Sequence, residues 1–76
     1  MIKVQVGNTL KKSEKIVSAD TTLRKVLEDA GVNYTTGITN LDGSSLTPGD
    51  LDKTFADFGI KERCYLVNVV KADNAV

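Results

Sequence analysis

The spacing of apolar residues changes along this chain of 76 residues, and the change restricts the fold more than any other feature. Ile2, Val4 and Val6 alternate with polar residues, which is the period of a half-buried strand. Over residues 23–30 the apolar side chains follow the helical period instead. Over residues 64–70 nearly every side chain is apolar or β-branched, which is typical of a central strand. A chain of this length can bury one helix stripe against one face of a sheet.

The first strand is expected to pair with a second strand over residues 15–19. Gly7 and Asn8 supply turn chemistry between the two strands, so the chain begins with a hairpin. The facing of the second strand stays open, because Ile16 and Val17 are adjacent and point to opposite faces.

A helix is predicted over residues 22–30, with its apolar stripe directed at the sheet. Asp20 or Thr21 can cap its amino end by accepting a free backbone N–H. Gly31 stands where a helix commonly ends in the left-handed conformation, and Val32 can fold back on the last turn.

The second half of the chain contains a short strand over residues 38–41, ended by the turn pair Asp42-Gly43. Residues 42–53 are expected to form a surface loop, in which Asp50 caps the turn that contains Leu51. A short helical turn then leads to the closing strand. The predicted core residues share a large aliphatic or aromatic side chain: Leu23, Val26, Leu27, Leu46, Phe58 and Ile60.

The predicted order of elements is ββαβ-turn-β, an α+β arrangement with one helix across one face of a mixed four-stranded sheet. The first and last strands are both apolar, so we expect them side by side in the sheet centre. That is the β-grasp arrangement.

The sequence resembles ubiquitin-like proteins over most of its length. The likeness is carried by LDGSSL at 41–46, by TFADFGI at 54–60, by the closing strand, and by Thr22-Leu23 with Val26 at the helix start. These are core and turn residues, so the resemblance implies a fold more than a function.

Two departures from the ubiquitin-like pattern affect the expected function. Conjugated members and the related sulfur carriers end in Gly-Gly, whereas residues 71–76 read KADNAV. We therefore expect a domain over residues 1–71, a flexible tail over 72–76, and no conjugation through that tail. Asn40 occupies the position of an aliphatic residue in the family's usual docking patch.

The sequence does not suggest catalysis, a metal site or a cofactor. The chain has no His, so Cys64 has no obvious base to activate it, and a small apolar filler is the simpler interpretation. Asn40, Asp42, Asp50 and Asp52 lack the Glu that a calcium loop of the EF-hand type requires, because the twelfth position is Leu51. We expect a protein that is not an enzyme.

Charge argues against nucleic acid or a membrane surface as the partner. Ten basic residues balance ten acidic residues, and the local cluster Lys11, Lys12 and Lys15 has no interleaved aromatic residue. This cluster is expected to be a solvated strand edge that discourages aggregation. The start of the chain does not read as a signal peptide, and with a free thiol this favours a cytoplasmic location.

The side of the sheet away from the helix is the expected protein-binding face. The resemblance would place Tyr65, Val67 and Val69 there, with Ile38 beside them, as an exposed apolar strip. Alternation alone favours the opposite facing, because burial of Asn68 in the other row is costly if the amide is unpaired. We adopt the first facing, in which the strand end offers Asn68 a partner or water.

These observations favour a non-catalytic protein-interaction or scaffold module, a monomer or weak homodimer whose protein partner the sequence does not identify. Two alternatives stay open: a protein modifier or sulfur carrier with an atypical end, and a small non-catalytic subunit of a larger enzyme complex.

Overall fold

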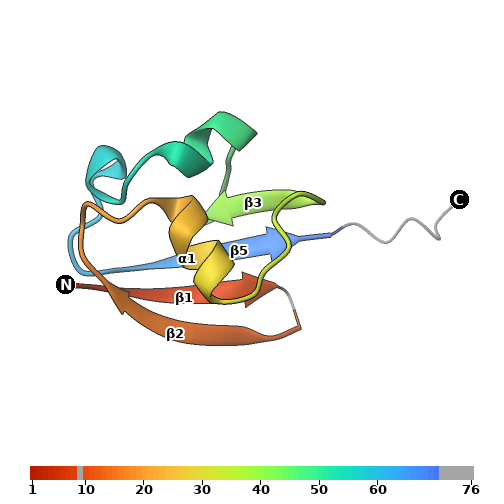
Figure 1. Ribbon diagram of the computed structural model, residues 1–76, viewed down its shortest axis with the longest axis horizontal. Coiled ribbons are helices and arrows are strands. Elements are labelled where there is room, and N and C mark those ends of the chain that lie inside the picture. The colour runs from red at the N-terminus through yellow and green to blue at the C-terminus, as the bar shows by residue number, and fades with distance from the viewer. Residues whose placement is uncertain (9, 71–76) are drawn as a thin grey trace, which may run out of the picture.

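The computed structural model describes residues 1–8 and 10–70, in which one helix lies across one face of a mixed sheet (Figure 1). The elements in chain order are the strands β1 (Ile2–Asn8) and β2 (Lys12–Val17), the helix α1 (Leu23–Asp29), the strands β3 (Ile38–Leu41) and β4 (Ser44–Ser45), the 3₁₀ helices η1 (Pro48–Asp52) and η2 (Ala56–Phe58), and the strand β5 (Arg63–Val69). The predicted domain boundary at residue 71 and the tail over 72–76 lie outside the described residues.

The sheet order is β2-β1-β5-β3-β4, in which β1 and β5 run parallel and the other neighbours run antiparallel. This β-grasp-like topology confirms the predicted α+β fold, including the central position of the first and last strands. The sheet has one strand more than expected, because the turn at Asp42 and Gly43 lets Ser44 and Ser45 pair with β3. No helix among the described residues has the length and apolar character to span a membrane.

The β1–β2 hairpin has a definite facing that the sequence left open. Ile2 pairs with Val17, which points to the helix side, while Ile16 points to the other side and is 60% exposed. The strand covers Lys12–Val17 rather than 15–19, because the side chain of Asn8 accepts the N–H of Lys11 and turns the chain early.

Helix α1 begins and ends through local hydrogen bonds. The hydroxyl of Thr22 accepts the N–H of Lys25 at 3.2 Å, so the prediction of Asp20 or Thr21 as the cap was wrong. The side chains of both of those residues instead bond to Ser18 in the preceding turn. At the other end Gly31 is left-handed, and the N–H of Val32 donates to the carbonyl of Leu27, which confirms the predicted stop.

The core lies between α1, η1 and the helix side of the sheet. Its buried apolar residues are Ile2, Val4, Val6, Leu23, Val26, Leu27, Leu41, Leu51, Phe55, Cys64 and Leu66. Three predicted core residues, Leu46, Phe58 and Ile60, are only partly buried and pack against its margin. The aromatic residue at the centre of the core is Phe55, not Phe58.

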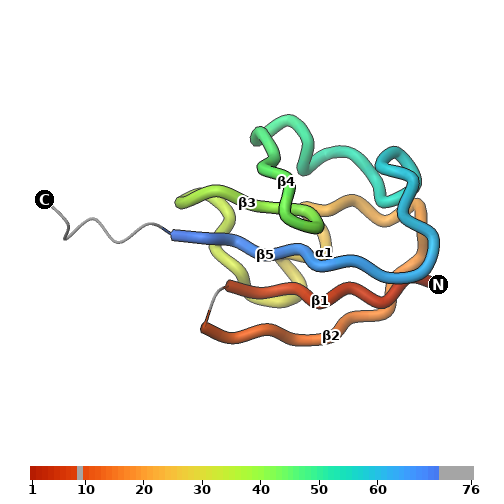
Figure 2. Tube along the Cα trace, turned by 180° about the vertical axis from the view of Figure 1, so that it is seen from behind, coloured from red at the N-terminus to blue at the C-terminus, as the bar shows by residue number. Residues whose placement is uncertain are grey.

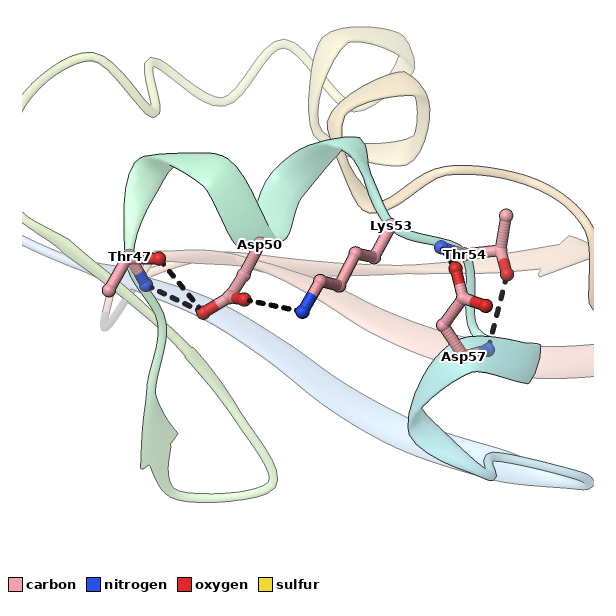
Figure 3. A network of polar contacts seen from close by, with 5 residues as sticks. All are labelled: Thr47, Asp50, Lys53, Thr54 and Asp57. Atoms are coloured by element: carbon pink, nitrogen blue, oxygen red, sulfur yellow. Dashed lines mark hydrogen bonds and ion pairs between the residues drawn. The ribbon is translucent and has the colours of Figure 1, made fainter.

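Two short capping turns hold the segment between β4 and β5 in place (Figure 3). The carboxylate of Asp50 accepts hydrogen bonds from the N–H and hydroxyl of Thr47, at 3.0 and 3.1 Å. Asp57 accepts the N–H of Thr54 at 2.9 Å and returns its own N–H to the Thr54 hydroxyl. The first turn confirms the predicted capping role of Asp50, and in both turns a carboxylate accepts a backbone N–H near the start of a 3₁₀ helix.

Candidate protein-binding face

Strand β5 alternates between a buried row and an outward row. Cys64, Leu66 and Asn68 are at most 2% exposed on the helix side. Tyr65 on the outward row is 56% exposed, Val69 is 37% exposed, and Val67 between them is half-buried. The view from behind the helix shows β5 in the middle of the uncovered face (Figure 2).

Ile38 extends the outward row onto the neighbouring strand. It pairs with Val69 in the antiparallel β3–β5 ladder, and its side chain is 54% exposed. Residues paired directly across a ladder point to the same face, so the two side chains are neighbours. We call Ile38, Tyr65, Val67 and Val69 the open strip. The geometry places these residues on the face where the resemblance put them; their role in binding stays a prediction.

The buried amide of Asn68 makes this facing possible. Its side-chain nitrogen donates to the carbonyl of Thr36 at 3.0 Å and to the hydroxyl of Thr39 at 3.2 Å. A buried amide with such partners no longer costs the free energy that an unpaired one would. Asn68 can therefore lie in the buried row of β5, because Thr36 in the loop before β3 and Thr39 in β3 supply the acceptors.

Gly37 lets the start of β3 approach β5 closely beside the open strip. Its φ of 71° is left-handed, and a Cβ at this position would lie 2.4 Å from the carbonyl oxygen of Val69. No side chain therefore separates Ile38 from the end of β5. Gly37 carries no signal of this role in the sequence, because only the contact with a residue 32 positions later gives it that role.

A shallow hollow of about 240 Å³ lies at one end of the open strip. Its lining residues are Gly37, Ile38, Asn40, Ser45 and Val69. The hydroxyl of Ser45 donates to the side chain of Asn40 at 3.1 Å, which forms the polar margin of the strip. The hollow is smaller than the sites of about 300–1,000 Å³ that hold small ligands.

Cys64 is placed as a core residue rather than as an exposed nucleophile. Burial, and secondarily the charge of Asp42, raise the pKa of its thiol to about 11. A thiol with that pKa stays protonated at neutral pH, whereas nucleophilic attack requires the thiolate.

The residues weighed as a calcium loop serve separate structural roles. Asp42 accepts the N–H of Tyr65 at 2.8 Å, and Asp52 lies 2.9 Å from the Nε of Arg24. Asp50 caps η1 and Asn40 bonds to Ser45. Among the described residues, no three Asp, Glu or Cys side chains lie together as a metal would require.

The local basic cluster does not form one patch. Lys12 lies on the open face opposite Gly7, Lys15 lies on the helix side opposite Val4, and Lys11 belongs to the turn. These residues are close in the sequence, but the pleat of β2 directs Lys12 and Lys15 to opposite faces of the sheet.

The sequence was also compared with known proteins. No family model and no curated protein matches it.

Proposed function

We propose that this chain is a non-catalytic, ubiquitin-like protein-interaction module that binds a protein partner through the open strip. The observation that carries the proposal is the contiguous group of exposed and half-buried apolar side chains on the uncovered face, with Ile38 and Tyr65 each more than half exposed. Apolar side chains that gather on the surface of a small domain commonly mark an interaction site.

The fold does not need the open strip for its own core. The inward row of β5 and the apolar rows of β1 and α1 already fill the space between helix and sheet. The outward side chains of Tyr65 and Ile38 keep more than half of their surface exposed within the monomer. A partner that covered them would gain the free energy of removing this apolar surface from water.

The ubiquitin-like part of the proposal rests on the resemblance at residues 41–46 and 54–60 together with the β-grasp-like topology. The proposed mode of action is binding of a partner at the sheet face rather than chemistry. A second copy of the chain on the same surface would give the weak homodimer that the sequence suggests.

The proposal is tested by affinity purification from an extract of the native source. We expect the tagged wild-type chain to retain a protein that the Ile38→Asp variant loses, because a charge in the strip would have to be desolvated on binding. A second copy as the partner would appear in sedimentation velocity as a mass that rises with concentration in the wild type only.

Leu10→Asp is the matched control. Leu10 is 94% exposed, but it lies in the turn between β1 and β2, outside the open strip. The Leu10→Asp variant should retain the partner. Equal retention by both variants, with both folded by circular dichroism, would contradict the proposal.

A further inference from the structure

The cations on the open face differ from those on α1 and around η1 in how they are paired. Three ion pairs join described residues on α1 and around η1: Arg24–Asp52, Lys25–Asp29 and Lys53–Asp50. On the open face, Lys3, Lys12 and Arg63 form no ion pair with any residue that the structure describes. These three cations outnumber the two carboxylates that lie beside the open strip, Glu14 and Asp42.

Two of these cations are held next to each other by the strand register. Lys3 and Arg63 are partners in the parallel β1–β5 ladder, and both are exposed. Like charges in neighbouring positions of a sheet repel each other. A carboxylate from outside the domain would relieve that repulsion.

Few groups on the domain's own open face compensate this charge. Two carboxylates lie near these cations: Glu14 on β2, which accepts a hydrogen bond from Gln5 at 3.3 Å, and Asp42, which accepts the N–H of Tyr65 at 2.8 Å. Lys12 faces Val67 across Gly7, which has no side chain to separate them. The open strip therefore has cations at the Arg63 end and along the side formed by β1 and β2.

We propose that the partner segment is acidic and aliphatic: carboxylates that meet Lys3 and Arg63, and branched aliphatic side chains that cover Val67, Val69 and Ile38. This inference rests on the proposed function and adds the chemistry of the partner. Successive outward residues of a strand are separated by about 7 Å. Arg63 is the outward residue next to Tyr65 on β5. The carboxylates of the partner therefore lie about 7 Å from the side chain that covers Tyr65, in the direction of Arg63.

The probe for this inference is a phage-displayed library of random dodecapeptides selected on the wild-type chain. The enriched peptides should combine Asp or Glu with Leu, Ile or Val. Their affinity should fall about tenfold in the Lys3→Glu/Arg63→Glu variant, because each exposed attraction becomes a repulsion. It should also fall as salt is raised.

Lys15→Glu is the control for the change of charge, because Lys15 points to the other side of the sheet. This variant should bind the selected peptides nearly as well as the wild type. Thermal unfolding of each variant checks the fold, and Lys3→Gln/Arg63→Gln should show a smaller loss of affinity than the Glu variant.

The outcomes separate this inference from the proposed function. Enriched peptides without acidic residues, which bind the Lys3→Glu/Arg63→Glu variant normally and the Ile38→Asp variant poorly, would overturn the acidic partner and leave the open strip as a binding site. A selection that yields no peptide dependent on Ile38 would count against both.

Discussion

The difference between two aromatic residues shows how local turns determine the core. The N–H of Phe55 donates to Thr21, and Thr22 and Thr54 form an isolated β-bridge, so Phe55 is drawn beneath the start of α1 and is fully buried. Phe58 lies three residues later at the margin, with the Lys53 ammonium 5.9 Å from its ring centroid.

Truncation of these two residues should therefore have unequal effects. Phe55→Ala should lower the free energy of unfolding by about 3–5 kcal/mol, which approaches the whole stability of a small domain. Phe58→Ala should cost only about 1–2 kcal/mol, because less of its surface is buried. Urea unfolding followed by circular dichroism measures both losses. A larger loss of unfolding free energy for Phe58→Ala would show that Phe58, rather than Phe55, lies at the centre of the core.

The carboxylate of Asp50 should make stability depend on pH in the acid range. Hydrogen bonds from the backbone and hydroxyl of Thr47 hold the pKa of this carboxyl below its ordinary value. The stabilisation of the folded state by this carboxylate is complete above its pKa in the unfolded chain, about 3.9. It is lost as the pH falls through the lower pKa of the folded state. Melting temperatures measured from pH 7 downward should therefore fall in acid.

The Asp50→Asn variant isolates this contribution. It should melt at a lower temperature than the wild type at pH 7 and show a smaller decrease in acid. Asp57 also has a lowered pKa and stays in the variant, so some dependence on pH should persist. An unchanged pH profile in Asp50→Asn would argue against the capping role.

At the level of elements, the join between β3 and β5 depends on one glycine. Gly37→Ala would bring a Cβ to 2.4 Å from the Val69 carbonyl oxygen at a left-handed φ, so the strands would have to separate. We expect a loss of more than about 1 kcal/mol in the free energy of unfolding. Gly49→Ala is the control, because a Cβ there meets no atom within 4 Å. Equal stability of the two variants would contradict the close approach.

The elements differ in how far the sequence determines them. The helix was predictable because its stripe, its stop at Gly31 and its length are encoded within a few neighbouring residues. Alternation alone did not predict the facing of β5, because the acceptors for Asn68 belong to Thr36 and Thr39, about 30 positions earlier. The same limit applies to the candidate site. The residues of the open strip followed from the resemblance, whereas the Lys3–Arg63 pair appears only with the parallel register.

At the level of the whole molecule, the open face should tolerate a charge that the core would not. Val67→Asp should leave the domain folded, with a loss of about 1 kcal/mol for the poor strand propensity of Asp. Leu66→Asp, on the adjacent inward position, should unfold it because the buried carboxylate has no partner in the core. Thermal unfolding distinguishes the two variants, and global unfolding of Val67→Asp would show that Val67 supports the core.

The most direct test of the proposed binding face is a map of the bound surface. The ¹⁵N-labelled chain is titrated with the recovered partner while the amide chemical shifts are followed. The largest changes should fall on Ile38, Tyr65, Val67 and Val69 and on the neighbouring strand positions, with little change across α1. Changes centred on α1 and η1, with an unaffected β5, would contradict the assignment of the open strip as the binding site.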